Sequence, residues 1–319
     1  MKIVVTDHTI VSAGGVSWAE MEKLGDLVLY DNTMPEELID RIKDATAVFS
    51  NRVKIPAEAI EAAPQMKMIG VFGTGIDNVD AKCAREHGVA VCNVPGYGRG
   101  AVAQMAIALM MEIARNTAFF NSYIKNVGWT DPIDLTLCNT RTIEMTGKTF
   151  GIIGMGDIGY AAARIAMAMD MNVLAYRRNP KPELECDQLH FADLDTVLRE
   201  SDVISIHCPL TPETEGLINK DTIAKMKDGV IFINVSRGKI MVQDDVADAL
   251  DSGKIYAAGI DTFFPEPCGK DHRLALHPRC IATPHVGWSP LETKQRVVNT
   301  CAANLKSVLD GNPQNVANK

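Results

Sequence analysis

Short apolar runs alternate with stretches of helical periodicity along the first hundred residues of the chain. The apolar runs predict β-strands at Ile3–Thr6, Leu27–Tyr30, Ala47–Ser50, Met68–Phe72 and Val89–Asn93. The intervening stretches predict helices at Trp18–Leu24, Pro35–Lys43, Pro56–Ala62 and Asp80–His87. Because strands that alternate with helices pair in parallel, this half of the pattern predicts a parallel sheet with helices on both faces.

A second series of apolar runs follows a long apolar helix, which we expect at Ala101–Arg115. Residues 116–147 are more polar and irregular, and a final helix is expected at Leu291–Leu309. The second series predicts strands at Thr149–Ile153, Val173–Tyr176, Val203–His207, Val230–Asn234, Ala257–Asp261 and Ile281–Thr283. Two such series separated by one helix indicate two α/β domains of related architecture.

Composition and net charge limit the class of protein and the kinds of molecule that it binds. Of the 319 residues, 46% are hydrophobic and 23% are charged, which is typical of a globular enzyme. The net charge of 32 − 40 = −8 argues against nucleic acid as a partner, and no apolar run reaches the ~20 residues that a membrane span needs. The eight cysteines are scattered without a CxxC pair, so we expect no metal site and a cytoplasmic, thiol-reducing location.

A glycine-rich turn follows the predicted strand Thr149–Ile153 and opens a helix of small and apolar residues. Its sequence is Gly154-Met-Gly-Asp-Ile-Gly159. In such a turn the first glycine permits a sharp bend, the second lets the backbone approach a pyrophosphate, and the third lets helix and strand pack closely. Because the helix N-terminus also attracts an anion, the turn predicts a dinucleotide-binding site.

The end of the next strand bears on which dinucleotide is bound. NAD-preferring sites place an acid there to accept a hydrogen bond from the ribose 2′-hydroxyl, whereas an arginine accommodates a 2′-phosphate. In this chain Val173–Tyr176 runs into Arg177 and Arg178, with no acid. Two guanidinium groups attract an additional phosphate, so NADP(H) is favoured over NAD(H).

We therefore expect an α/β chain with two Rossmann-like domains on parallel sheets. Residues 1–98 and 287–319 are expected to form a substrate-binding domain, because the final helix crosses back to the first series. Residues 99–286 are expected to form the dinucleotide-binding domain. The substrate is expected in the cleft at the carboxyl ends of the strands.

Three loops at predicted strand ends carry residues suited to carbonyl reduction. Arg237 follows one apolar strand, Glu266 lies in a loop after the next, and His285 follows a third. An arginine, a carboxylate and a histidine are the groups that reduction of a carbonyl beside a carboxylate requires.

At this point the chain resembles the D-isomer-specific 2-hydroxyacid dehydrogenases over essentially its whole length. Two further segments of that pattern are Gly73-Thr-Gly-Ile-Asp-Asn-Val-Asp80 and Cys208-Pro-Leu-Thr-Pro-Glu-Thr214. Within the family it looks most like the glycerate dehydrogenase (hydroxypyruvate reductase) branch, on the evidence of Ser17-Trp18, Val102-Ala-Gln-Met105 and Pro284-His-Val-Gly-Trp288. Arg177 departs from the pattern, because NAD-dependent members usually have aspartate at this position.

The resemblance implies a role for each member of the triad. Arg237 would bind the carboxylate of a small 2-keto acid such as hydroxypyruvate or glyoxylate and polarise its keto oxygen. His285 would donate a proton to that oxygen as hydride arrives from the nicotinamide. Glu266 would hydrogen-bond the other ring nitrogen, fixing the tautomer and favouring imidazolium. Hydride leaves the cofactor itself, so no metal is needed.

The resemblance also implies contacts outside the triad. Backbone N–H groups of Thr74 and Gly75 would bind the substrate carboxylate, and Asp261 would hold the nicotinamide carboxamide. The implied cofactor-binding residues are Gly154, Met155, Gly156, Asp157, Ile158, Gly159, Arg177, Arg178, Cys208, Pro209, Thr214, Val235, Asp261, His285 and Gly287. The first domain is expected to be flavodoxin-like.

A homodimer built around Ala101–Arg115 and the arm at residues 116–147 is implied as well. Trp129 and the pair Phe119-Phe120 are expected to be interface anchors or, equally, core residues. His207 also follows a strand and is interpreted as cofactor-side packing or a backbone hydrogen bond.

Two alternatives remain. One is a dehydrogenase of another acid, such as phosphite, formate or a bulkier 2-keto acid. The other is a dinucleotide-sensing corepressor on the same fold. We expect turnover, because the triad is intact and nothing in the sequence resembles an appended recruiting tail.

Overall fold

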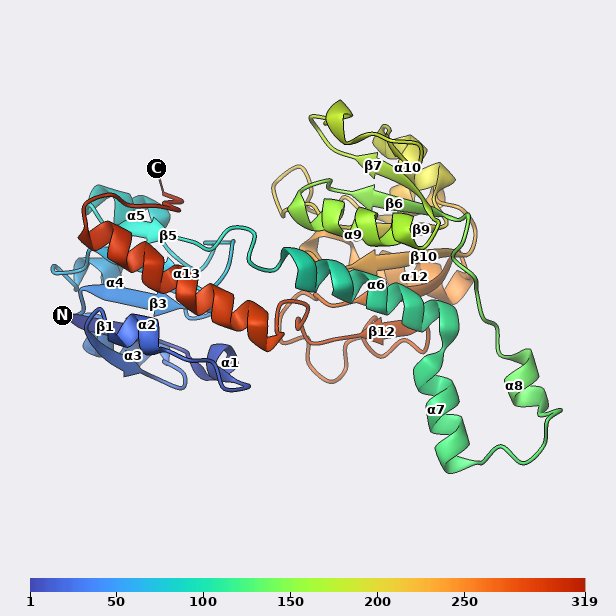
Figure 1. The fold of residues 1–319 in the computed structure, drawn as a ribbon, viewed down its shortest axis with the longest axis horizontal. Helices are drawn as coiled ribbons and strands as arrows, with labels where there is room; N and C mark the ends of the chain where they lie inside the picture. Colours follow the sequence, from blue (N-terminus) through green and yellow to red (C-terminus); the bar gives the residue numbers. More distant parts are fainter. Residues whose placement is uncertain (319) are drawn as a thin grey trace. The chain divides into compact units, whose positions relative to one another are not determined.

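The computed structural model describes residues 1–318, so Lys319, the last residue of the expected first domain, lies outside the described residues. The chain divides into two compact units, Met1–Gly98 with Trp288–Lys319, and Arg99–Gly287. Both units are α/β with all-parallel sheets, as expected (Figure 1). The chain thus leaves the first unit after Gly98 and returns to it at Trp288.

The first unit contains a five-stranded sheet in the order β2-β1-β3-β4-β5, which is the flavodoxin-like order. Its strands are β1 (Lys2–Val5), β2 (Asp26–Leu29), β3 (Ala47–Ser50), β4 (Met68–Val71) and β5 (Ala90–Cys92). Its helices are α1 (Thr9–Ser12), α2 (Ala19–Glu22), α3 (Pro35–Ile42), α4 (Ala57–Glu61), α5 (Ala81–Glu86) and α13 (Leu291–Leu309). Helix α13 packs on α2 and β4, which ties the end of the chain to its beginning (Figure 1).

The second unit contains a seven-stranded sheet in the order β12-β11-β10-β9-β6-β7-β8. Its strands are β6 (Thr149–Ile153), β7 (Asn172–Tyr176), β8 (Leu189–Phe191), β9 (Val203–Ile206), β10 (Val230–Asn234), β11 (Ile255–Ile260) and β12 (Cys280–Ala282). Its helices are α6 (Arg99–Arg115), α7 (Thr117–Asn126), α8 (Leu135–Asn139), α9 (Asp157–Ala168), α10 (Leu194–Glu200), α11 (Lys220–Ala224) and α12 (Gln243–Ser252). The strand order reverses between β6 and β9, which is where open α/β sheets bind ligands.

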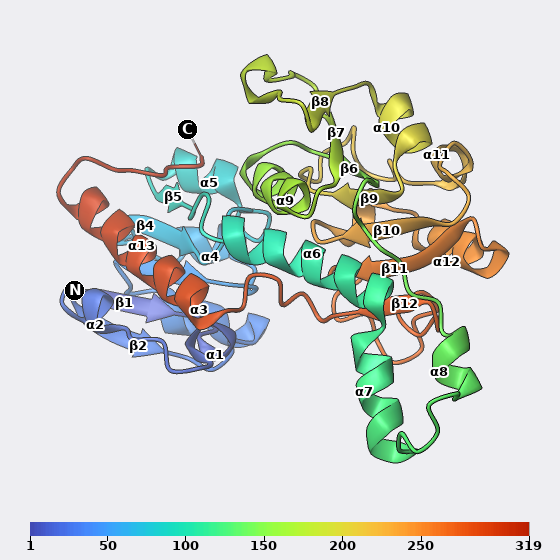
Figure 2. The ribbon, with the colours of Figure 1, turned by 45° about the vertical axis from the view of Figure 1, so that its right-hand side comes forward.

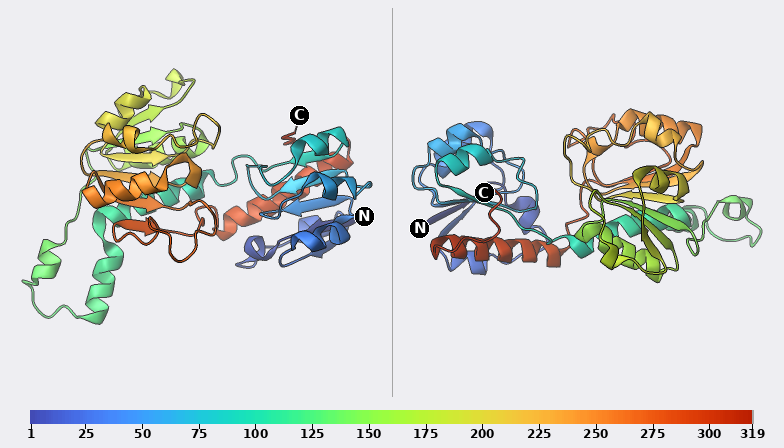
Figure 3. Two further views of the ribbon diagram at one scale, coloured as in Figure 1. Left: turned by 180° about the vertical axis from the view of Figure 1, so that it is seen from behind. Right: turned by 90° about the horizontal axis from the view of Figure 1, so that it is seen from above.

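The apolar strands of this sheet supply two cores because successive side chains point to opposite faces. Helices cover both faces of the sheet (Figure 3). Ile152 packs with α6 and α9 on one face, whereas its neighbour Ile153 packs with α10 and α12 on the other. Phe232 and Ile233 of β10 divide in the same way. Burial on both faces explains why these strands read as continuous apolar runs rather than as alternating patterns.

The structure corrects the expected pattern in two places. Residues 116–147 were expected to be irregular, but they contain the helices α7 and α8, which form an arm extending from the second unit (Figure 2). Strand β8 was not expected. No helix within the described part of the chain is both long and apolar enough to span a membrane.

Candidate active site

The carboxyl ends of three neighbouring strands carry the predicted catalytic residues. Strands β10, β11 and β12 pair in parallel in this order (Figure 2). Arg237 follows β10, Glu266 lies in the loop after β11, and His285 follows β12. Because parallel strands end at one edge of a sheet, the topology gathers the three residues at the same edge of the second unit.

His285 and Glu266 form a direct pair. His285 Nδ1 lies 2.8 Å from Glu266 Oε2, and the other carboxylate oxygen accepts the N–H of Phe263 at 3.0 Å. The hydrogen bond from Phe263 restrains the orientation of the Glu266 carboxylate, and the carboxylate in turn restrains the orientation of the imidazole ring. Within residues 1–318, His285 Nε2 makes no hydrogen bond, and 27% of the side chain is exposed, which leaves this nitrogen accessible to a ligand.

Asp261 anchors the loop that carries His285. Its buried carboxylate accepts the hydroxyl of Thr283 at 2.5 Å and the N–H groups of Val286 and Gly287 at 3.0 and 2.9 Å. The expected contact of Asp261 with the nicotinamide stays a prediction. The structure adds a second task for this residue, which is to hold the loop on both sides of His285.

Arg237 lies in a tightly built turn. Its carbonyl accepts the side-chain amide of Asn234 at 3.1 Å, and its guanidinium donates to the carbonyl of Ser236 at 2.9 Å. A Cβ atom on Gly238 would lie 2.2 Å from the carbonyl carbon of Phe263, so only glycine fits beside the loop that holds Glu266. Gly238 was not predicted as a residue of the site. Its position directly after Arg237 could have indicated that it shapes this turn.

Gln243 was not predicted from the sequence as a residue of the site. This side chain from α12 donates to the carbonyl of Phe264 at 2.6 Å and accepts the N–H of the same residue at 3.1 Å. The amide thereby braces the loop between β11 and Glu266. A polar residue at the start of a helix gives no sequence signal for such a contact.

The glycine-rich turn fits a bound dinucleotide. Gly154 has φ +105°, and a Cβ atom there would lie 2.3 Å from the nitrogen of Cys208. A Cβ atom on Gly159 would lie 2.4 Å from the carbonyl oxygen of Gly154. A Cβ atom on Gly156, in contrast, would meet nothing within 4 Å. The space above Gly156 is therefore open, while the other two glycines are required by close packing, as the roles of the three glycines demand.

The other residues of the turn lie between the end of β6 and the first turn of α9. Met155 is buried, and Asp157 and Ile158 begin α9, whose first N–H groups lack helical acceptors. Val235 is buried directly after β10.

The two arginines after β7 lie beside this turn. Arg177 is half-buried and donates to the carbonyl of Met155 at 3.1 Å. Arg178 is exposed, and its guanidinium lies 3.8 Å from the carboxylate of Glu213. Two guanidinium groups therefore lie at the end of β7, and that of Arg178 is paired with an acid.

The loop after β9 approaches the glycine turn from the other side of the switch point. Cys208 is buried against Gly154, and its carbonyl accepts the hydroxyl of Ser236. The hydroxyl of Thr214 donates to the carbonyl of Pro209 at 2.7 Å, which closes this loop. Thr214 thus shapes the loop that presents Pro209.

His207 makes a different contact from the one expected. Its Nε2 lies 2.9 Å from the hydroxyl of Ser205 rather than bonding to the backbone, and its buried Nδ1 has no partner within residues 1–318. Burial lowers the pKa of His207 to about 4, so the ring is neutral at pH 7.

Thr74 and Gly75 belong to the first unit and follow the carboxyl end of β4. The carbonyl of Thr74 accepts the side-chain amide of Asn93 at 2.7 Å, and its hydroxyl donates to the carbonyl of Val94 at 3.2 Å. The N–H groups of Thr74 and Gly75 have no acceptor in the described residues. Both are therefore open to an anionic ligand.

Comparison with known proteins agrees with this geometry. A family model described as D-isomer specific 2-hydroxyacid dehydrogenase, NAD binding domain, matches residues 107–287. Hydroxypyruvate reductase from Blautia hydrogenotrophica is 44% identical over 322 residues, an alignment that covers 100% of both proteins.

Solved structures extend the likeness to both units. A protein from Thermus thermophilus is 31% identical with a TM-score of 0.87, covering 99% of this chain and 100% of that one. A glyoxylate reductase from Paecilomyes thermophila is 29% identical with a TM-score of 0.86, covering 99% and 98%. Sequence and fold therefore agree along nearly the whole chain.

Proposed function

Because the chain belongs to the D-isomer-specific 2-hydroxyacid dehydrogenase family, we propose that it reduces hydroxypyruvate, or a 2-keto acid of similar size, to the D-2-hydroxy acid with NADPH as the preferred reductant. The observation that carries the proposal is the His285–Glu266 pair. Its two residues lie in the loops after β12 and β11, and β11 pairs with β10, the strand that Arg237 follows. The 44% identity to a hydroxypyruvate reductase supports the choice of substrate.

Arg237 binds the substrate carboxylate and polarises the keto oxygen beside it, because a guanidinium presents parallel N–H donors to two oxygens in one plane. In the first unit, the N–H groups of Thr74 and Gly75, which have no acceptor within residues 1–318, are the expected donors to a substrate carboxylate. The glycine turn Gly154–Gly159 would hold a reduced nicotinamide dinucleotide, which would supply the hydride for the keto carbon.

His285 donates a proton from Nε2 to the keto oxygen and takes it back in the reverse direction. Glu266 makes this assignment specific, because its bond to Nδ1 leaves Nε2 as the nitrogen that faces the ligand. One proton and one hydride are added to the carbonyl, so the product is the 2-hydroxy acid.

NADPH is proposed because of the charge at the end of β7. Arg177 is held beside the glycine turn by its bond to Met155, and Arg178 adds a second guanidinium. A ribose 2′-phosphate needs donors of this kind, whereas the ribose 2′-hydroxyl of NADH is usually bound by an acid.

We also propose that the protein works as a homodimer in the cytoplasm. The arm α7–α8 exposes large apolar side chains that a partner chain would cover: Phe119, Ile124, Val127, Trp129, Ile133 and Leu135. The partly or fully exposed Phe119, Phe120 and Trp129 are thus surface rather than core residues. Two thiols, Cys138 and Cys186, are exposed, and a reducing compartment preserves them.

A spectrophotometric assay tests the reaction. The purified chain should oxidise NADPH when hydroxypyruvate is added, more slowly with pyruvate, and not at all without a keto acid. Tight NADPH binding without oxidation in the presence of any small 2-keto acid would contradict the reaction and leave a binding function.

The cofactor preference has a separate test. kcat/KM should be higher with NADPH than with NADH, and Arg177→Asp should reverse that order by repelling the 2′-phosphate. Arg199→Asp is the control and should leave the preference unchanged, because Arg199 lies near the end of α10 and its guanidinium is 3.8 Å from the carboxylate of Asp195. A wild-type preference for NADH would refute the NADPH assignment and leave the reaction intact.

A further inference from the structure

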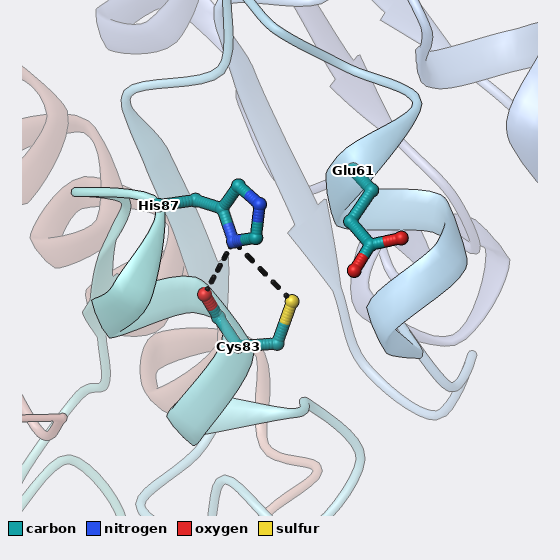
Figure 4. A group of neighbouring side chains, drawn as sticks. All are labelled: Glu61, Cys83 and His87. Atoms are coloured by element: carbon teal, nitrogen blue, oxygen red, sulfur yellow. Dashed lines mark hydrogen bonds between the residues drawn. The ribbon is translucent and has the colours of Figure 1, made fainter.

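A cluster of three potential metal ligands lies in the first unit, away from the residues described above. It consists of Glu61 at the end of α4, Cys83 in α5 and His87 directly after α5 (Figure 4). One ligand atom from each residue lies within 4.8 Å of the others. In the part of the chain that the structure describes, no other group of three histidine, cysteine or acidic residues is this close.

The backbone holds the cluster in place. Asp80 accepts the N–H of Cys83 at 2.9 Å and so fixes the start of α5, and α4 packs against α5. The four-residue spacing puts Cys83 and His87 on one face of the helix, and the Glu61 side chain points toward them from α4 (Figure 4).

His87 is arranged as metal-binding histidines usually are. Its Nδ1 lies 2.9 Å from the carbonyl oxygen and 3.5 Å from the sulfur of Cys83 (Figure 4). The bond to the carbonyl places the hydrogen on Nδ1, so Nε2 carries the lone pair. A histidine that binds a metal commonly donates its other ring N–H to a backbone carbonyl in this way. Coordination through Nε2 would keep the bond to Cys83.

We infer that Glu61, Cys83 and His87 bind one divalent cation of the zinc type, with water as a fourth ligand. A thiolate, an imidazole and a carboxylate are the ligands that zinc takes in proteins, and the two anionic ligands balance its charge. Tetrahedral zinc at usual bond lengths places its ligand atoms about 3.3–3.6 Å apart. The ligand atoms lie within 4.8 Å of one another, so metal binding requires the exposed side chains of Glu61 and His87 to move closer to Cys83.

The surroundings favour a cation. The Cys83 side chain is buried, and the carboxylates of Glu61 and Asp80 lie near it. The same negative charges attract a divalent ion. On binding, the thiol proton leaves to solvent and the sulfur–metal bond forms, so one proton is released per ion.

The site would join α4 to α5 and stabilise the first unit. Helix α5 runs back across the sheet from β4 to the start of β5, so His87 lies at the edge opposite the carboxyl end that carries Thr74 and Gly75. A cation there acts on the fold rather than on the reacting groups.

Cobalt is the probe that tests this site, because a thiolate bound to Co²⁺ gives a charge-transfer absorption band in the near ultraviolet. The full chain, freed of metal, should show such a band at one equivalent of Co²⁺ and lose it when Zn²⁺ is added. Zn²⁺ should also raise the unfolding temperature.

Variants show whether the Co²⁺ absorption band arises from this cluster. Cys83→Ser should abolish it, and Glu61→Gln and His87→Asn should each weaken Co²⁺ binding by more than the ~10-fold typical of losing an outer-shell partner. Glu58→Gln, on the same helix, and Cys138→Ser, an exposed thiol elsewhere, are the matched controls and should bind normally.

The inference is overturned if no band appears, or if Glu61→Gln and His87→Asn bind Co²⁺ as the wild type does. These two side chains are exposed, so the variants test the site even if Cys83→Ser fails to fold, which circular dichroism would show.

Discussion

His285 has a backbone conformation that side-chain-bearing residues rarely adopt, with φ +55°. Such a conformation costs about 1–3 kcal/mol and persists only where its surroundings enforce it. Asp261 enforces it by accepting bonds from Thr283 before His285 and from Val286 and Gly287 after it. In this conformation the imidazole contacts Glu266. The buried carboxylate of Asp261 is therefore needed to hold the loop in place.

Replacing His285 should remove most of the turnover while NADPH still binds. Loss of a general acid typically lowers kcat by about 10²–10⁴-fold. Because alanine is strained at positive φ, His285→Asn is the better variant, since asparagine accepts this conformation. Steady-state kinetics and NADPH fluorescence titration measure the two effects, and a kcat near that of the wild type would exclude His285 as the proton donor.

Glu266→Gln should lower kcat less than His285→Asn does. The amide can still contact the imidazole, but it no longer offers a charged acceptor that fixes the ring tautomer. Gln243→Ala is an informative companion, because it loosens the same loop without touching the pair. Equal kcat values for Glu266→Gln and the wild type would contradict the positioning role.

His207 makes stability depend on pH. Burial lowers the folded pKa from 6.5 to about 4, so between these values the unfolded chain binds more protons than the folded one. Stability should therefore fall as pH decreases from 6.5 toward 4, by about 2 kcal/mol at pH 5. Unfolding temperatures at pH 7.5 and 5 should differ more for the wild type than for His207→Asn, and parallel pH curves would refute this contribution.

At the scale of elements, Gly156 of the glycine turn matters for dinucleotide binding, whereas Gly159 of helix α9 matters for the stability of the fold. Gly156→Ala should leave the unfolding temperature nearly unchanged, because its Cβ meets nothing in the protein, yet weaken the dinucleotide by about tenfold, or 1.4 kcal/mol. Gly159→Ala should destabilise the protein itself, since its Cβ would lie 2.4 Å from the Gly154 carbonyl oxygen. Thermal unfolding with and without NADPH distinguishes them; equal destabilisation by both would contradict the open space above Gly156.

The sequence predicted most elements because parallel sheets bury apolar runs on both faces. Strands such as Ala47–Ser50 and Val230–Asn234 and the helix Leu291–Leu309 were therefore predicted with the bounds that the structure shows. Strand β8 was missed because Leu189–Phe191 has only three residues, the middle one exposed. Helix α7 was missed although Phe119, Tyr123 and Ile124 recur at helical spacing; none of its residues is buried within the chain.

The site was predictable to the extent that each functional residue follows a strand. Arg237 and His285 were found in this way, whereas the contact of Gly238 with Phe263 joins loops that only the sheet order brings together. The metal-ligand cluster gave no signal either. Spacing between cysteines cannot reveal it, because Cys83 is its one cysteine and Glu61 comes from another helix.

At the scale of the whole molecule, the exposed apolar side chains of the arm α7–α8 support the proposed dimer. Trp129 and Ile133 are 67% and 72% exposed, and Leu135 is 69% exposed, an arrangement that water disfavours over so short a segment. A second copy of the chain that covers these side chains would remove the apolar area from solvent and hold the arm in place.

Placing charge on the arm should therefore dissociate the protein. We expect the wild type to sediment at twice the mass of one chain and the double variant Trp129→Asp/Ile133→Asp to sediment as a monomer, because each aspartate would have to be buried without a partner. Lys125→Asp, a change of charge at a polar position of α7, is the control and should stay dimeric. Sedimentation of the wild type as a monomer at micromolar concentration would exclude the dimer, and a dimeric double variant would place the interface elsewhere on the chain.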